Sequence, residues 1–374
     1  MVNKVRFVDP GRVYRIIKEE LDAAYFEVMT KGDLIDRGQL KSFEANLARF
    51  VGTKYAVGLN SGYDALHMSL RAAGIGAGDE VIVPAHTFVA TCSAVVNVNA
   101  IPVLVDVGKD FNIDVDKVEE AITPKTRAII PVHLSGYMAD MVRVMEIAEK
   151  YNLAVIEDAC QSLGSSMAHP QNGDRLAAGA WGLTGCWSFY PFKILGGYGD
   201  GGAITTNDRE VALFATRMRY NGEDRETGEY HGHGFTCLLD NLQAAFLDVK
   251  LKHLPAWIIR RKQIAERYRG ALSDLPDLLL PHYDDPRRDH VYQNYTIRSK
   301  QGNEFSDYLK ANGVEVLTQF RKPYYKHEAL KLVDRVFPET EALSREVCSL
   351  PMNVEIADDE VDYVIKVVRQ FYGK

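Results

Sequence analysis

A single lysine in an unusual setting is the first candidate for chemistry in this sequence. Residues 188–203 read SFYPFKILGGYGDGGA, so Lys193 stands between aromatic side chains and closely spaced glycines. A lysine in such apolar, tightly turned surroundings can bind a phosphate, cap a helix or form a Schiff base through its amine. Its role depends on which side chains the rest of the chain brings to it.

The glycines after Lys193 formally match a dinucleotide-binding pattern. The spacing G-x-G-x-x-G occurs at Gly197, Gly199 and Gly202. That fingerprint opens a helix, whereas AITTND follows here and predicts a strand. The phosphate-binding pattern GxxxxGK[ST] is absent. We therefore interpret the glycines as positive-φ turn residues that let the chain double back beside Lys193.

Further polar groups follow the predicted strands. Asp158 ends the run LAVIED, and its neighbour Glu157 is expected to face solvent. The run YAVGLN is followed by SGYDALHMSL, a predicted helix whose first N–H groups, at Ser61 and Gly62, form a natural phosphate seat. Ligands in open α/β sheets bind beyond the carboxyl ends of the strands, so we expect these groups to lie near Lys193.

A hydroxyl and an aromatic ring complete this set. Ser188, within the run GCWSFY, adds a hydroxyl near Lys193, and Phe88 follows the run VIVPA. A lysine amine, a buried acid, a phosphate seat and an aromatic plate are the parts that hold pyridoxal phosphate, because the lysine forms a Schiff base and the acid keeps the pyridine nitrogen protonated. The structural alternative makes Asp158 a helix cap, places Phe88 in the core and pairs Lys193 with a carboxylate.

Seven apolar runs must position these groups. They are YAVGLN, VIVPA, IPVLVDV, AIIPVHL, LAVIED, GCWSFY and GGAITT, and amphipathic stretches separate many of them. Near-continuous apolar strands that alternate with helices predict a mostly parallel sheet covered on both faces. The predicted fold class is therefore α/β, with a seven-stranded, mostly parallel sheet in one large cofactor-binding domain over residues 30–250.

The pattern changes after residue 240. Residues 241–254 have helical spacing, and Pro255 is expected to open a second, long and charged helix. The strand-like stretches YQNYTIRSK and EVLTQF and the closing helix DDEVDYVIKVVRQFYGK follow. We predict a smaller α+β domain over residues 251–374, with an N-terminal helix within residues 1–29 packing on it.

Composition excludes several classes of protein. The net charge of −7 argues against a nucleic-acid or membrane partner. No apolar run approaches the ~18–20 residues that span a bilayer, and the first residues lack the apolar core of a signal peptide. Five scattered cysteines without a CxxC pair favour reduced thiols over disulfides or a metal site. We expect a cytoplasmic protein.

The chain resembles the nucleotide-sugar aminotransferases, the DegT-like group of fold-type I pyridoxal-phosphate enzymes. The most specific matches are IEDACQSLGS and SFYPFKILGGYGDGGAITTND, supported by GDEVIVPAHTFVAT, TPKTRAIIPVHLSG and SLPMNVEI, so the resemblance covers nearly the whole chain. It implies an enzyme that moves an amino group from L-glutamate to a nucleotide-linked keto-sugar. It also implies a homodimer with shared active sites and a role in amino-sugar biosynthesis such as that of lipopolysaccharide O-antigen.

The same resemblance implies roles for single residues. Lys193 would form the Schiff base, Asp158 would contact the pyridine nitrogen, and Gln161 would lie near the ring oxygen. Phe88 would stack on the ring. The remaining cofactor contacts, chiefly to the phosphate, would come from Ser61, Gly62, Tyr63, Ser188 and, across the dimer, Thr236.

Some positions depart from the family pattern. Tyr63 stands where a threonine is usual, and in GFTCLLD Thr236 and Leu238 replace an asparagine and an arginine. Tyr325 replaces a histidine in a loop whose Arg321, Lys322 and Tyr325 are the candidates for substrate binding. The cations of this loop, Arg321, Lys322 and Lys326, could equally be a solvated face. The lysine segment looks more like that of enzymes acting on 3-keto than on 4-keto sugars. Alternatives are a sugar dehydratase, whose relatives carry histidine in place of the lysine, and a cofactor-binding regulator.

Overall fold

A computed structural model describes residues 4–170, 173–281, 285–332 and 335–374. A seven-stranded sheet forms its centre, with strand order β1-β9-β8-β5-β4-β2-β3. These strands are β1 (Tyr55–Leu59), β2 (Glu80–Pro84), β3 (Ile101–Val105), β4 (Thr126–Ile129), β5 (Ala154–Asp158), β8 (Thr184–Ser188) and β9 (Gly202–Thr206). Only β9 runs antiparallel to its neighbours. The seven runs predicted from the sequence are these strands, so the predicted α/β fold class is confirmed.

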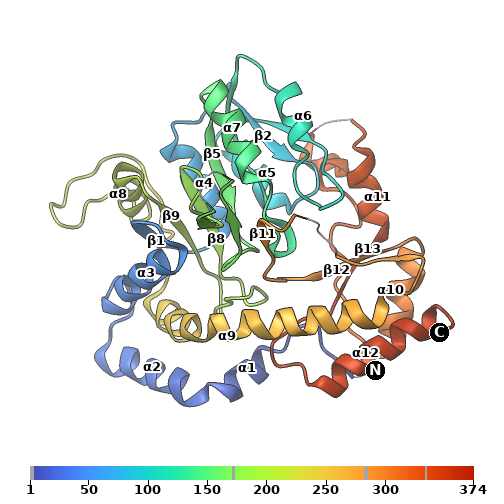
Figure 1. Cartoon of the computed structure of the whole chain (residues 1–374). Coiled ribbons are helices and arrows are strands. Elements are labelled where there is room, and N and C mark those ends of the chain that lie inside the picture. Colours follow the sequence, from blue (N-terminus) through green and yellow to red (C-terminus); the bar gives the residue numbers. More distant parts are fainter. Residues whose placement is uncertain (1–3, 171–172, 282–284, 333–334) are drawn as a thin grey trace.

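Helices cover both faces of this sheet, which explains why its strands are apolar throughout (Figure 1). One core cluster joins the sheet to α4 (Gly62–Ala72), α5 (Val89–Asn97) and α8 (Arg209–Met218). The other joins it to α3 (Gly38–Val51), α6 (Val115–Glu120), α7 (Met141–Tyr151) and the first half of α9 (Asn241–Leu272). Because the parallel strands run in one direction, their carboxyl ends lie along one edge of the sheet.

A third core cluster surrounds a small sheet of order β10-β12-β13, formed by Leu278–Leu279, Tyr295–Ser299 and Val347–Leu350. The helices α10 (Gly302–Ala311), α11 (Pro338–Glu346) and α12 (Asp358–Phe371) lie beside it (Figure 1). A third sheet, β11-β6-β7, is formed by Arg288–Asp289, Ser166–Ala168 and Arg175–Ala177. The prediction of a strand at EVLTQF was wrong, because this stretch forms only an isolated bridge, between Leu317 and Ser349.

The helix expected to start at Pro255 does not exist as a separate element. Helix α9 runs unbroken through this proline for 32 residues, and Leu251 and Leu254 are buried beside it. Packing on both sides of the proline outweighs the lost backbone hydrogen bond. The boundary placed at residues 250 and 251 falls inside this helix, and the two-domain division stays a prediction.

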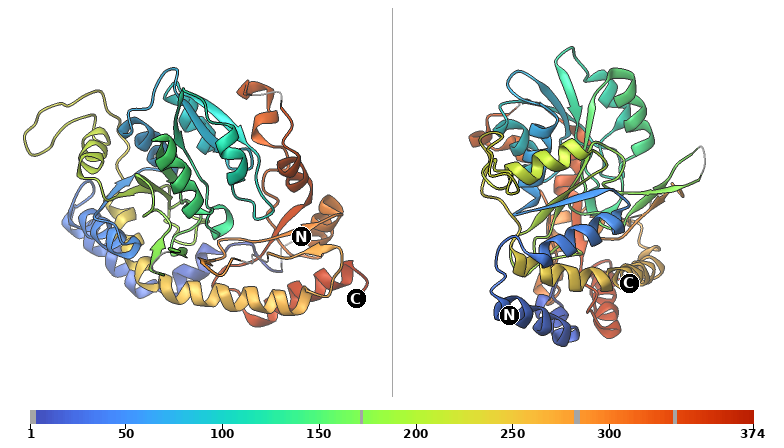
Figure 2. Two further views of the ribbon diagram at one scale, coloured as in Figure 1. Left: turned by 45° about the horizontal axis from the view of Figure 1, so that its top comes forward. Right: turned by 90° about the vertical axis from the view of Figure 1, so that its left-hand side faces the viewer.

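The N-terminal segment forms two helices rather than one, α1 (Pro10–Ile16) and α2 (Lys18–Lys31). They lie along α9 on the side away from the large sheet (Figures 1 and 2). Ile17 and Leu21 pack against Val249 of α9, and Arg12 forms an ion pair of 2.6 Å with Glu360 of α12. The N-terminal segment therefore contacts both the first half of α9 and the C-terminal helix α12.

Candidate active site

Lys193 lies in a turn just beyond the carboxyl end of β8. Its backbone N–H donates to the carbonyl of Tyr190 at 2.8 Å, and Pro191 between them fixes the turn. The side chain is half-buried. Within the part of the chain that the structure describes, its ammonium has no hydrogen bond or ion pair. An unpaired amine at a strand end is available for covalent chemistry.

The glycines after Lys193 do not have the backbone conformation expected from the sequence. None of the five in residues 196–202 has a positive φ. They instead permit close approach: a Cβ on Gly196 would lie 2.4 Å from the carbonyl oxygen of Pro191, and one on Gly202 would lie 2.2 Å from the carbonyl carbon of Ser61. The strand β9 follows, which confirms that the segment opens no nucleotide-binding helix.

The predicted phosphate seat is the N-terminus of α4. The Ser61 hydroxyl caps this helix by accepting from the N–H of Asp64 at 3.0 Å, and it also contacts the Asp64 carboxylate at 2.7 Å. The N–H groups of Gly62 and Tyr63 have no acceptor among the described residues. A Cβ on Gly62 would lie 2.8 Å from that of Ser188, so these two residues are in contact. Free N–H groups and the helix dipole favour an anion here.

Tyr63 can contribute only its backbone to this seat. Its hydroxyl accepts a hydrogen bond of 2.6 Å from the side chain of Asn97, and its ring stacks on His67. The side chain is therefore directed toward α5. The hydroxyl contact that a threonine would make in the family pattern is missing from this chain.

Asp158 is buried at the end of β5, and a threonine holds its carboxylate. Thr91 donates to Oδ2 at 2.8 Å, and the N–H of Cys160 donates to Oδ1 at 3.3 Å. Gln161 is buried three residues after Asp158, where its side-chain oxygen accepts from the N–H of Ser135 at 2.8 Å. Thr91 was not predicted as a site residue. Its position in the helix that follows Phe88 was the only feature of the sequence that pointed to it.

The groups at the strand ends lie close enough to affect one another electrostatically. The pKa of the Cys160 thiol is raised well above its usual range by burial and by the Asp158 carboxylate, while the Lys193 ammonium opposes the rise. Gly62 packs against the Cys160 sulfur, since a Cβ there would lie 2.8 Å from it. Lys193, Asp158 and Gly62 thus lie close to one thiol at the edge of the sheet, and Ser188 packs on Gly62. The ends of three strands, β1, β5 and β8, meet there.

Glu157 does not face solvent, contrary to expectation. It is fully buried on the opposite face of β5 from Asp158. Its carboxylate accepts hydrogen bonds of 2.8, 2.8 and 2.9 Å from the N–H groups of Gly179, Trp181 and Gly182, and contacts His133 at 3.0 Å. A turn that crosses this face buries it, so Glu157 is a structural acid.

The ring expected over the cofactor is accessible. Phe88 occupies the N-cap position of α5 with 58% of its surface exposed, beyond the end of β2. Its neighbour His86 is buried, and burial lowers the pKa of the imidazole to about 4. The imidazole is therefore neutral at pH 7, and its ring packs edge-on against that of Phe320.

Other candidates lie apart from this cluster. Tyr325 is buried in the core against Phe337, so its ring is committed to packing. Arg321 donates to the hydroxyl of Ser306, and Lys322 is exposed. Thr236 is exposed and donates to the Asn221 side chain at 3.1 Å.

The segment that carries Thr236 nevertheless runs beside the phosphate seat. The N–H of Asn60 donates to the carbonyl of Cys237 at 2.8 Å, and Leu238 forms a bridge with Leu59. Leu238 is partly buried against the core. No cation stands at this position, where the family pattern has an arginine.

Known proteins resemble this chain over its whole length. It is 38% identical to the dTDP-3-amino-3,4,6-trideoxy-alpha-D-glucose transaminase of Streptomyces venezuelae, over 98% of this chain and 96% of that protein. It is 37% identical to a pleiotropic regulatory protein of Geobacillus stearothermophilus, over 98% of each. No helix among the described residues is long and apolar enough to cross a membrane.

Solved structures have the same fold. The S. venezuelae DesV complex with a ketimine intermediate superposes with a TM-score of 0.94 at 37% identity, covering 100% of both chains. NtdA from Bacillus subtilis, with bound cofactor PMP, gives 0.90 at 30% identity, covering 100% of this chain and 86% of NtdA. The model of the DegT/DnrJ/EryC1/StrS aminotransferase family matches residues 15–369. This chain therefore belongs to the DegT/DnrJ/EryC1/StrS aminotransferase family, as its sequence predicted.

Proposed function

We propose that the protein moves the amino group of L-glutamate to the 3-keto position of a nucleotide-linked sugar, with pyridoxal phosphate as its cofactor. The observation that carries the proposal is the unpaired amine of Lys193 at the strand ends that also bear Asp158 and the N-terminus of α4. The S. venezuelae relative is a transaminase of a 3-amino sugar, which supports position 3.

Pyridoxal phosphate fits the groups at the site. The unpaired N–H groups of Gly62 and Tyr63 and the hydroxyl of Ser188 suit a phosphate dianion. Because Gly62 has no side chain, Cys160 and Ser188 pack directly against its backbone, which brings Ser188 next to these N–H groups. The buried carboxylate of Asp158 suits the pyridine nitrogen, and the exposed ring of Phe88 suits an aromatic face.

The chain's own residues divide the work of the reaction. When bound, the cofactor supplies the electron sink that a carbanion at the substrate carbon requires. Asp158, oriented by Thr91, holds the proton on the pyridine nitrogen. With the cofactor bound, Lys193 would move the proton at the substrate carbon as general base and acid. The N-terminus of α4 would anchor the phosphate and so keep the cofactor in place relative to Lys193 and Asp158.

We further propose a homodimer with shared active sites, located in the cytoplasm and serving amino-sugar synthesis such as that of O-antigen. The segment between α8 and α9 extends away from the body of the chain (Figure 1). It carries Tyr230, which is 69% exposed, and Phe235, which packs on His67. A second subunit would cover this apolar surface and supply the cation that Leu238 does not.

Two alternatives predict different results. A sugar dehydratase of this fold carries histidine where this chain has Lys193, which argues against that activity. A regulator that keeps the cofactor would bind it at Lys193 without turnover, and the name of the G. stearothermophilus relative keeps this alternative in view.

Turnover distinguishes these alternatives. The protein, loaded with pyridoxal phosphate, is supplied with L-glutamate and either a 3-keto or a 4-keto dTDP-sugar, and the release of 2-oxoglutarate and the aminated sugar are measured. We expect amination of the 3-keto sugar only, and none by Lys193→Ala. Amination of the 4-keto sugar would overturn the regiochemistry, whereas cofactor binding without turnover of either sugar would favour the regulator.

A further inference from the structure

The main chain on both sides of Lys193 is held by one side chain that is remote in sequence. Gln293 is buried, and its amide nitrogen donates to the carbonyl of Phe192 at 3.0 Å. Its amide oxygen accepts from the N–H of Ile194 at 2.6 Å. The two bonds therefore fix the residues immediately before and after the lysine, while Lys193 itself closes the turn to Tyr190.

The residues around Gln293 are held in turn. Arg261 of α9 is buried and donates to the carbonyl oxygens of Tyr292 and Gln293 at 2.9 and 3.2 Å. A Cβ on Gly136 would lie 2.9 Å from the backbone nitrogen of Gln293, so the loop that contains Gly136 packs tightly against the main chain of Gln293. Gln293 thus has little freedom to follow a moving lysine turn.

The backbone next to Gln293 is strained. Tyr292 has a φ of 53°, in the left-handed region that bulky residues rarely adopt. Its N–H donates to Nδ1 of His290 at 3.0 Å, and the two rings stack at 3.9 Å. Strain of this kind persists only where the surroundings impose it, and it gathers at functional sites.

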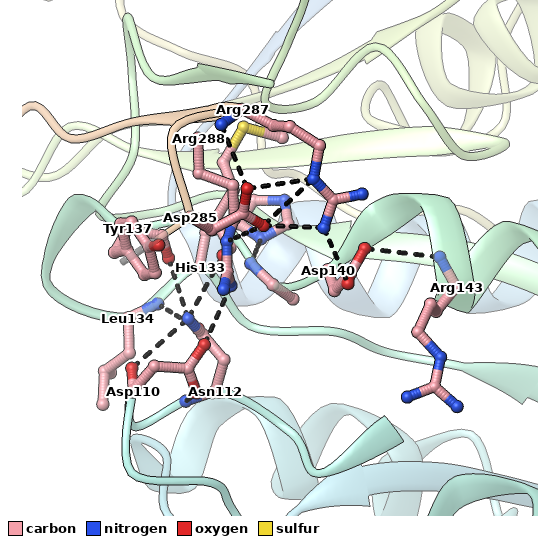
Figure 3. A network of polar contacts seen from close by, with 12 residues as sticks. Asp110, Asn112, His133, Leu134, Tyr137, Asp140, Arg143, Asp285, Arg287 and Arg288 are labelled. Atoms are coloured by element: carbon pink, nitrogen blue, oxygen red, sulfur yellow. Dashed lines mark hydrogen bonds and ion pairs between the residues drawn. The ribbon is translucent and has the colours of Figure 1, made fainter. Parts of the chain in front are cut away.

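A network of ion pairs anchors the start of this segment (Figure 3). Arg287 contacts Asp285 at 2.7 Å and Asp140 at 3.2 Å. Arg288 contacts Asp110 at 2.8 Å and lies over the ring of Tyr137 at 4.4 Å. The segment that ends in Gln293 is thereby tied to the loops beyond the strands of the large sheet.

We propose that Gln293 is the positioning residue for Lys193, which it holds by both flanking peptide groups so that the amine is aimed at the reacting carbon. This inference rests on the proposed function. A lysine side chain has four rotatable bonds, so the direction of its amine depends on how firmly its backbone is fixed. A peptide clamp restricts the backbone without touching the amine, which stays free to carry a proton.

The test compares Gln293→Met, which keeps the length of the side chain and removes both hydrogen bonds, with Gln243→Met. Gln243 accepts from the N–H of Tyr198 at 2.9 Å. It therefore fixes the same glycine-rich segment, but at a position that is not next to the lysine. Two quantities are measured: the dissociation constant of pyridoxamine phosphate, which cannot bond to the lysine, and the rate at which apoprotein captures pyridoxal phosphate on Lys193, fixed by borohydride and located by mass spectrometry.

We expect Gln293→Met to slow capture by ~10- to 100-fold, the cost of misplacing a reacting group by about 1 Å, with pyridoxamine phosphate binding within about twofold of wild type. Gln293→Glu keeps only the bond to Ile194, so its capture rate should lie between those of the wild type and Gln293→Met. It replaces Gln293→Met in the test if the methionine variant does not fold. Unchanged capture, an equal loss in Gln243→Met, or a parallel loss of pyridoxamine phosphate affinity would overturn the inference. Failure of the wild type to capture the cofactor on Lys193 would instead overturn the proposed function.

Discussion

The hydroxyl of Thr91 donates a hydrogen bond of 2.8 Å to Oδ2 of Asp158, and both side chains are buried. This bond crosses from the first turn of α5 to the end of β5, so the helix that follows Phe88 also orients the acid. The direction of a buried carboxylate depends on the groups that donate to it, and this bond is shorter than the one of 3.3 Å from the N–H of Cys160.

Replacement of Thr91 by valine should therefore slow the reaction without unfolding the protein. Valine keeps the branched shape and removes the donor. A hydrogen bond to a charged group contributes ~1.5–3 kcal/mol, so we expect a fall in the rate of the glutamate half-reaction of roughly tenfold or more, measured by stopped-flow absorbance. Thr216→Val, which removes a hydroxyl whose one hydrogen bond among the described residues goes to the carbonyl of Ala212, is the matched control. Equal rates in both variants would count against the role of Thr91.

The adjacent acids Asp158 and Glu157 should respond differently to the same change. Asp158→Asn should keep the fold, lose transamination and weaken cofactor binding by roughly 1.5–3 kcal/mol, because an amide cannot hold the pyridine nitrogen protonated. Glu157→Gln turns an amide N–H toward buried N–H groups and should lower the free energy of unfolding by about 3 kcal/mol. Urea unfolding and equilibrium cofactor binding measure the two effects. A stable Glu157→Gln or an active Asp158→Asn would contradict this assignment.

Lys250 should make stability depend on pH. It is buried beneath the lysine turn, donating to the carbonyl of Gly196 at 2.7 Å and lying over the ring of Tyr198. Burial lowers its pKa to about 8 from 10.5, although Glu355 opposes the shift. Between these two values the unfolded chain binds more protons than the folded one, so the lysine's contribution to stability rises with pH.

The measurement is urea unfolding from pH 7 to 10, with Lys250→Met as the reference. The free energy of unfolding of the wild type minus that of the variant should increase across this range, because other titrating groups cancel in the difference. Parallel curves would show that the charge of Lys250 is not penalised in the folded state.

The exposed cation Lys322 should matter for the sugar substrate alone. If it contacts the nucleotide, Lys322→Ala should raise the KM for the nucleotide-sugar and leave the glutamate half-reaction intact, since uniform binding is lost without harm to the chemistry. Exposed Lys331→Ala, from the same loop region, is the control. A loss in both half-reactions would indicate damaged folding, and no loss in either would make Lys322 a surface residue.

The candidate site was partly predictable because its main groups are local features of single segments. Lys193 follows a strand by a proline-containing turn, Asp158 ends a strand and Gly62 opens a helix, so each position follows from nearby sequence alone. Thr91 and Gln293 were not predictable in this way. Their partners lie 67 and 99 to 101 positions away, and neither residue type signals a site by itself.

The sequence by itself determined the seven strands, the lysine and acid at their ends and the family, because apolar periodicity and strand-end motifs are local. Tertiary structure alone decided what covers each face. Alternation along β5 directs Glu157 and Asp158 oppositely, but only the turn at residues 179–182 buries Glu157. Only the closeness of neighbouring backbone, not positive φ, requires glycine at Gly196 and Gly202. Packing on both sides likewise carried α9 through Pro255, where local propensity predicted a helix start.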